Sequence, residues 1–191
     1  MTKIYALVYS AYVEVSFLKT IHTPHGFDES IITQIQTARN LEEKWIKCID
    51  FAFDGIRTEH NKGEISNKEL KLRRIIETYI IGPSHVRNKI AHGQWKACLN
   101  SDCTGINYDL TTQMTQMDFV KIDILFNVYR LFVQCVEDLI EFPYRAHYRF
   151  FYSRIVALEE YIDETKDYSM ESKLAILQSS PKHINRSRQL S

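Results

Sequence analysis

The chain has 191 residues, and 24 Lys and Arg residues balance 24 Asp and Glu residues. This length suits one domain with a single core, and a hydrophobic content of 45% excludes a globally disordered chain. The formal net charge of zero excludes a protein that coats nucleic acid through its overall charge, but it allows a local basic site. With only 6 Gly and 4 Pro, the chain is too poor in turn residues for an all-β fold.

The N-terminal segment is apolar, but no stretch approaches the roughly 18 consecutive apolar residues that a membrane span needs. Glu14 interrupts the apolar run, and no small-residue cleavage site follows it, so we expect a mature helix rather than a signal peptide. The four cysteines lack the spacing of a disulfide framework. These features predict a cytoplasmic protein with free thiols and no membrane contact.

Apolar periodicity predicts an all-α protein, an antiparallel bundle of about five helices. The first helix covers residues 3–20, with a turn at 23–26. The second covers residues 28–60, and a capping-box pattern at Ser66 and Glu69 opens the third, which Gly82-Pro83 should break. A short helix over 84–94, with Ser84 as its N-cap and Gly93 as its stop, should follow.

The second half of the chain contains the clearest helical pattern. Residues 95–111 have no helical period and predict an exposed loop that includes a small hairpin. From Phe119 to Ile140, apolar residues recur in steps of three and four on a wide face, which is typical of a central bundle helix. A fifth helix covers 145–164. We therefore expect a helical domain over residues 1–164 and a polar tail over 165–191 that is flexible or bound to a partner.

The first predicted helix has an aliphatic stripe and, beside it, three tyrosines. The stripe consists of Ile4, Leu7, Ala11, Val15 and Leu18, and the tyrosines are Tyr5, Tyr9 and Tyr12. The tyrosines could form a dimer surface, but packing within the monomer is the simpler interpretation.

Residues 84–95, with the sequence SHVRNKIAHGQW, contain the most informative motif. From Lys68 to Lys96, both included, there are seven Lys or Arg residues and two Glu residues, so this face should attract a phosphate-bearing partner. Asn88 and His92 share one face of a helix, whereas Arg87 and His92 diverge by roughly 140°. Either the helix begins or bends within the motif, or these residues meet their counterparts from a second subunit.

These side chains suit metal-free cleavage of RNA. The imidazole of His92 can take a proton from a ribose 2′-hydroxyl, and the guanidinium of Arg87 can hold the adjacent phosphate. Asn88 can orient the substrate or the histidine by hydrogen bonding. The substrate is then RNA, because the 2′-hydroxyl is the nucleophile.

Arg87-Asn88-Lys89-Ile90-Ala91-His92, set between helices of an α bundle, resembles the Arg-x4-His signature of HEPN domains. This resemblance implies a homodimer with a composite active site, in which Arg87 and His92 are catalytic and Asn88 supports them. It also implies a metal-independent endoribonuclease without a cofactor, acting as a toxin or in abortive-infection defence, with an antitoxin or sensor protein as a possible partner. One departure is Gln94, which replaces the tyrosine found in HEPN toxins that are silenced by nucleotidyl transfer.

Other residues could contact RNA, but each also has a simpler interpretation. His85 and Lys89 lie beside the motif, and His85 is more simply a solvated residue of the first helical turn. Arg145 and Arg149 alternate with aromatic residues in a segment that could stack RNA bases. A helix packed through Phe151, Ile155 and Leu158, with its arginines pointing outward, explains the same spacing, and we prefer that interpretation.

Two further alternatives concern metal binding and the class of function. Cys98 and Cys103, with His92 nearby, lack the spacing and the second ligand pair of a zinc site, so we predict no metal site. Some HEPN-like domains are not nucleases, so the rival hypothesis is a non-catalytic module: an antitoxin, a scaffold or a nucleotide-binding regulator.

Overall fold

A computed structural model describes residues 2–179 of the chain. In chain order its helices are α1 (Thr2–Ile21), α2 (Glu29–Gln36), α3 (Leu41–Asp54), α4 (Lys62–Ile75), η1 (Ile76–Ile81), α5 (Gly82–Ala91), α6 (Tyr108–Gln116), α7 (Phe119–Glu141), α8 (Pro143–Arg145), η2 (Ala146–Phe150), α9 (Phe151–Thr165) and α10 (Met170–Ser179). The segments η1 and η2 are π-helical. The described residues contain no sheet, only an isolated antiparallel bridge between Leu99 and Ile106. The all-α prediction is confirmed, although the helical segments outnumber the five that the sequence predicts.

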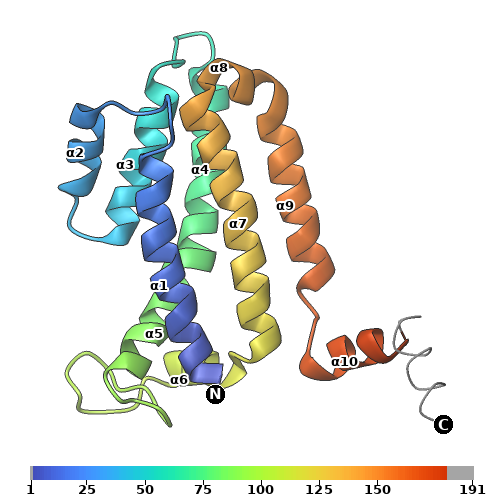
Figure 1. The fold of residues 1–191 in the computed structure, drawn as a ribbon. Helices are drawn as coiled ribbons and strands as arrows, with labels where there is room; N and C mark the ends of the chain where they lie inside the picture. Colours follow the sequence, from blue (N-terminus) through green and yellow to red (C-terminus); the bar gives the residue numbers. More distant parts are fainter. Residues whose placement is uncertain (1, 180–191) are drawn as a thin grey trace.

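The long helices α1, α3, α4, α7 and α9 lie side by side and form the body of the molecule (Figure 1). Helix α7 is central, because it packs against α1, α3 and α9. Helices α1 and α7 run in the same direction, whereas α4 and α9 run in the opposite direction (Figure 1). Helix α5 and the loop after it lie at the end of the bundle that also contains the N-terminus, whereas α8 lies at the other end.

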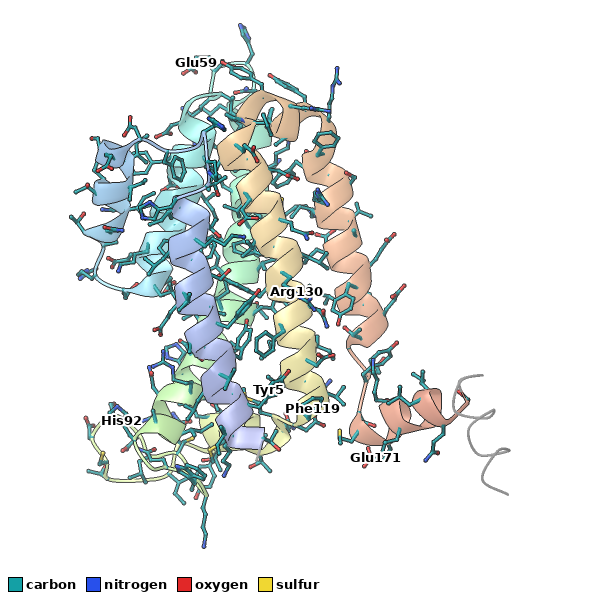
Figure 2. The ribbon with its side chains drawn as sticks, viewed as in Figure 1. Tyr5, Glu59, His92, Phe119, Arg130 and Glu171 are labelled. Atoms are coloured by element: carbon teal, nitrogen blue, oxygen red, sulfur yellow. The ribbon has the colours of Figure 1, made fainter. Side chains whose placement is uncertain are left out.

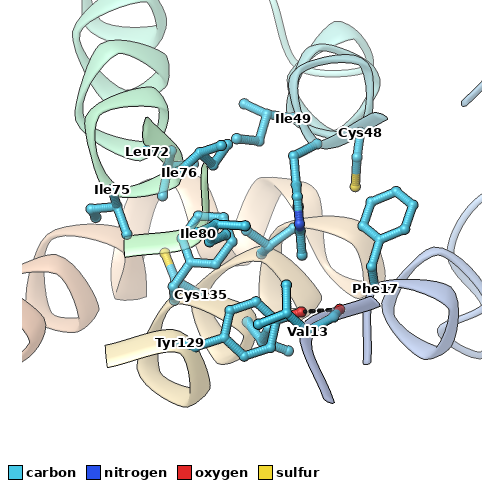
Figure 3. Close-up of a cluster of buried hydrophobic side chains, with 14 of the residues drawn as sticks. Val13, Phe17, Cys48, Ile49, Leu72, Ile75, Ile76, Ile80, Tyr129 and Cys135 are labelled. Atoms are coloured by element: carbon cyan, nitrogen blue, oxygen red, sulfur yellow. Dashed lines mark hydrogen bonds between the residues drawn. The ribbon is translucent and has the colours of Figure 1, made fainter. Parts of the chain in front are cut away.

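The core is built around aromatic residues from three helices. Trp45 of α3 is fully buried, and its ring lies 4.7 Å from that of Phe17 and 4.9 Å from that of Phe132. Tyr129 of α7 donates a hydrogen bond of 3.0 Å to the carbonyl oxygen of Val13 in α1 (Figure 3). Burial raises the pKa of this phenol well above its ordinary value, so it remains a neutral donor. These contacts fix α1, α3 and α7 relative to one another.

The face of α1 that packs against the bundle is not the aliphatic stripe seen in the sequence. The residues buried in the core include Ala6, Tyr9, Val13 and Phe17. Ile4, Val15 and Leu18 are exposed instead, by 55%, 68% and 48%. The tyrosines do pack within the monomer: Tyr9 is buried, and Tyr5 and Tyr12 contact the ring of Phe126.

Helix α1 is also the one helix of the described residues that is long and apolar enough to cross a membrane, judged by length and composition alone. A core helix meets the same criterion, and 39% of the α1 window is buried within the protein.

Two predicted helix boundaries are wrong, one of them because a local cap overrides the apolar period. The predicted helix over 28–60 is divided into α2 and α3, since the side chain of Asn40 caps α3 by accepting a hydrogen bond of 2.9 Å from the amide of Glu43. Helix α4 begins at Lys62, so Ser66 lies inside the helix and does not cap it.

Gly82-Pro83 does not break the helix, contrary to the prediction. The chain passes from α4 through the π-helical segment η1 directly into α5, and Pro83 occupies the first turn of α5. A proline is tolerated there because its fixed φ is helical and the π-helical turn before it shifts the hydrogen-bond register, with the amide of Gly82 donating to the carbonyl oxygen of Glu77. Ser84 is not an N-cap, since its hydroxyl donates to the carbonyl oxygen of Ile81 at 2.7 Å. Gly93 does end α5, and its φ of +78° is the left-handed conformation that glycine tolerates best.

The remaining segments agree with the prediction only in part. Residues 98–107 form a hairpin-like loop whose tip, residues 101–104, is exposed, but α6 begins at Tyr108, inside the predicted loop over 95–111. The fifth predicted helix corresponds to α8, η2 and α9 in succession. In the predicted tail, Met170–Ser179 forms α10, and residues 180–191 lie outside the described part of the chain.

Candidate functional site

Helix α5 presents the Arg87–His92 motif at one end of the bundle. Val86 and Ile90 of α5 are buried in the core, which turns the side chains of His85 and Asn88 outward. His92 is the exposed C-cap residue, and the amide of Gly93 donates to the carbonyl oxygen of Ile90 at 3.0 Å. The helix end therefore fixes His92 next to the beginning of the following loop (Figure 2).

Two side chains anchor that loop to α5. The ammonium group of Lys89 donates to the carbonyl oxygen of Leu99 at 2.7 Å, and the side-chain oxygen of Gln94 accepts from the amide of Leu99 at 2.7 Å. Gln94 is thus a structural residue of the loop, and Lys89, predicted to bind RNA, uses one donor within the protein. Trp95, which follows Gln94, is 46% exposed.

The helix end and the loop enclose an open cleft of about 500 Å³. It is lined by His85, Asn88, Lys89, His92, Gln94, Asn100, Ser101, Cys103 and Leu110. Four of the residues predicted from the sequence therefore meet in one cleft. Imidazole, amide and ammonium groups can donate hydrogen bonds to phosphate oxygens, and a neutral imidazole can also accept a proton, so this cleft can hold a polar, anionic ligand.

Arg87 does not line this cleft. Its guanidinium group forms an ion pair with Glu14 of α1 and also donates to the side-chain oxygen of Asn88 at 3.2 Å. Arg87 is therefore connected to the cleft only through Asn88, which agrees with the divergence of Arg87 and His92 expected for a regular helix. Within one chain, the structure does not bring Arg87 and His92 together.

Arg145 and Arg149 lie away from the cleft, on α8 and η2 at the opposite end of the bundle (Figures 1 and 2). Together with Tyr144 and Tyr148 they border a separate open surface pocket, and the guanidinium of Arg145 lies 5.3 Å from the centre of the Phe150 ring. Phe151, Ile155 and Leu158 are buried, as the preferred interpretation of this segment predicts. The structure does not place these arginines in one site with His92.

Glu14 and the loop residues Asn100 and Ser101 were not predicted as site residues, and Cys103 was considered only as a zinc ligand and rejected. Glu14 is 73 residues from Arg87, and no local pattern indicates their contact. The loop residues reach the cleft through the turn closed by Asn100 and Gly105. In the described residues, no group of three or more His, Cys, Asp or Glu side chains is arranged to hold a metal ion.

A second polar cluster is buried between α4 and η2. The ammonium group of Lys68 lies 3.0 Å from Nδ1 of His147, donates to the His147 carbonyl oxygen at 2.7 Å and pairs with Glu64 at 2.7 Å. Burial and the Lys68 charge lower the pKa of His147, while the hydrogen bond from Lys68 lowers the pKa of Glu64. Nδ1 therefore acts as the acceptor of a neutral imidazole.

No family model, curated protein or solved structure matches this chain.

Proposed function

We propose that this chain is a metal-independent endoribonuclease of the HEPN type, which acts in the cytoplasm as a homodimeric toxin or anti-phage effector. The observation that carries the proposal is the cleft at the end of α5, in which exposed His92 and Asn88 lie beside His85 and Lys89. A phosphodiester entering this cleft meets a proton acceptor and several hydrogen-bond donors.

In the proposed reaction, His92 accepts the proton of a ribose 2′-hydroxyl while the 2′-oxygen attacks the adjacent phosphorus. The bond from phosphorus to the 5′-oxygen breaks, and that oxygen takes a proton from water or from His92 of the second subunit. The products are a 2′,3′-cyclic phosphate and a 5′-hydroxyl. Arg87 of the second subunit stabilises the negative charge on the phosphate, because Arg87 of the same chain pairs with Glu14 outside the cleft. In each chain, Asn88 accepts a hydrogen bond from Arg87 and so helps to position it.

One observation favours the alternative of a non-catalytic module. Arg87 is bound to Glu14 and does not line the cleft, which is what a purely structural arginine would do. In that case the chain serves as an antitoxin, a scaffold or a nucleotide-binding subunit. RNA is then not a substrate, and substitution of His92 leaves the function unchanged.

The two functions separate when the wild type, His92→Ala and Arg87→Ala are expressed in bacteria from an inducible promoter. For a nuclease, we expect growth arrest and RNA fragments that end in 2′,3′-cyclic phosphate, and both variants should lose these effects while keeping their helicity. His60→Ala is the matched control, because His60 is also exposed but lies next to Glu59 at the other end of the bundle (Figure 2).

With purified protein, a chelator should leave cleavage unchanged, and a 2′-deoxy substitution at the cleaved linkage should abolish it. A requirement for a divalent metal would contradict the proposed mechanism. Intact RNA and equal growth for the wild type and both variants would support the non-catalytic module instead.

A further inference from the structure

Helix α1 has two apolar faces on opposite sides, and only one of them packs against the bundle. At about 100° per residue, the buried residues of α1 centre on one side of the helix. Ile4, Val8, Ala11, Val15 and Leu18 fall within a sector of roughly 80° on the opposite side. These five residues, named here the outer seam, are all exposed in the single chain.

The outer seam has the spacing of a helix–helix contact. Its residues follow one another in steps of four, three, four and three, the pattern by which two helices pack along a narrow seam. Val8 is 50% exposed and Val15 is 68% exposed, and no charged residue interrupts the seam. A solvent-facing stripe of this kind is typical of a surface that binds another helix.

The order of side chains in the seam is nearly the same in both directions. Ala11 lies at its centre, Val8 and Val15 flank it, and Ile4 and Leu18 lie seven residues away on either side. When two copies of α1 pack antiparallel around a two-fold axis at Ala11, each valine faces a valine and Ile4 faces Leu18. The small side chain of Ala11 allows the helices to approach closely at that axis.

We propose that the outer seam of α1 binds the outer seam of a second copy of this chain in an antiparallel two-fold dimer. The axis of such a dimer is perpendicular to the two helices. An element that lies along one edge of the seam, such as α5, therefore lies on the same side of the interface in both copies. A parallel pair would place the two elements at opposite edges.

The charges at the edge of the seam suit this arrangement. Glu14 lies three residues from Ala11 and pairs with Arg87 of α5, which packs against α1. The dimer therefore brings two Arg87 and two Glu14 side chains to one edge, where each guanidinium meets carboxylates of both copies and charge is balanced.

If the proposed function holds, this dimer supplies the cleft with an arginine near His92, which a single chain lacks. The two α5 helices lie on the same side of the interface, so Arg87 of one copy is near the motif of the other. The second subunit is thus the source of the arginine that acts together with His92.

The oligomeric state tests the proposal without any RNA. By light scattering, we expect the wild type at twice the chain mass of 22.5 kDa, and Val8→Lys/Val15→Lys at the chain mass with unchanged helicity. Val156→Lys on α9 is the matched control, because Val156 is also apolar and 47% exposed, and it should leave the dimer intact. A monomeric wild type, or a double variant that remains dimeric, would overturn the proposal. A monomeric wild type that cosediments with phosphatidylcholine vesicles would assign the seam to a membrane instead.

Disulfide trapping tests the orientation. Val8→Cys and Val15→Cys are made separately in a Cys103→Ser background, because Cys103 is the exposed cysteine and Cys48, Cys98 and Cys135 are buried. In the antiparallel dimer, position 8 faces position 15, so a mixture of the two variants should form a disulfide-linked dimer on oxidation and each variant alone should not. Cross-linking of either variant alone would indicate a parallel pair and contradict the proposal.

Cleavage assays distinguish failure of this inference from failure of the proposed function. A seam-dependent dimer that leaves RNA intact would refute the nuclease and keep the dimer. If Val8→Lys/Val15→Lys cleaves RNA as fully as the wild type does, the nuclease function is retained and the role of the seam in the active site is refuted.

Discussion

Lys68 and His147 are buried together in the bundle, and their contact makes stability depend on pH. The folded protein holds His147 neutral with a lowered pKa, whereas the unfolded chain protonates it near the ordinary value of about 6.5. Below that pH the unfolded state binds more protons, so the free energy of unfolding should fall as the pH decreases, by at most about 1.4 kcal/mol per pH unit for this group. The lowered pKa of Glu64 acts in the same direction at more acidic pH.

Urea unfolding at several pH values below neutrality checks this expectation. His147→Gln keeps an oxygen acceptor for Lys68 but removes the titrating group, so its unfolding free energy should vary less with pH than that of the wild type. His60→Ala should retain the wild-type slope. An equal slope for the wild type and His147→Gln would show that another group causes the dependence.

For single residues, the sequence could predict chemistry but not contacts. Asn88 and His92 were predicted to share a face of a helix, and both line the cleft at the end of α5. The partner of Arg87 could not be predicted, because Glu14 belongs to a helix that is distant in the sequence. The buried pair of Lys68 and His147 was missed for the same reason, since 79 residues separate them.

Two glycines at the ends of α5 should respond to alanine in opposite ways. Gly93 has a φ of +78°, so Gly93→Ala should destabilise the protein by about 1 kcal/mol or more and disturb His92 beside it. At Gly82 the φ is −50°, and an added Cβ would lie 3.4 Å from the Glu77 carbonyl oxygen, so Gly82→Ala should stabilise by about 0.4–1 kcal/mol. Denaturant unfolding of both variants checks the signs, and a stabilising Gly93→Ala would contradict the assigned helix end.

Helices could be predicted from apolar period, but their interruptions and their packing faces could not. The period of α7 indicated a central helix, and α7 indeed packs against α1, α3 and α9. The break before Asn40 depends on a side-chain cap, and the passage through Gly82-Pro83 depends on a π-helical turn, neither of which changes the apolar period. In α1 both faces are apolar, so the period alone cannot tell which of them the bundle buries.

On the scale of the whole molecule, Trp45 connects the helices that carry the fold. Its ring contacts Phe17 of α1 and Phe132 of α7, so Trp45→Ala should lower the free energy of unfolding by about 3–5 kcal/mol. Trp95→Ala is the matched control, because Trp95 is 46% exposed and its loss should change stability by about 0.5 kcal/mol or less. Equal unfolding free energies for the two variants would place the centre of the core elsewhere.

The arrangement of the helices in the bundle could not be predicted from the sequence either. The all-α class follows from composition and period, but the parallel course of α1 and α7 depends on the additional helix α2, which the sequence analysis merged with α3. The separation of Arg145 and Arg149 from His92 follows from that arrangement, since α8 and η2 lie at one end of the molecule and the end of α5 lies at the other.

The two tryptophans also give the protein two separate optical reporters. Trp45 is in an apolar, fully buried environment, so its fluorescence should report unfolding, whereas Trp95 is exposed beside Gln94, which lines the cleft. In Trp45→Phe, emission comes from the cleft side alone, and in Trp95→Phe it comes from the core alone. Titration of an uncleavable 2′-deoxy oligonucleotide should then quench the first variant and leave the second unchanged, so occupancy of the cleft can be measured independently of catalysis.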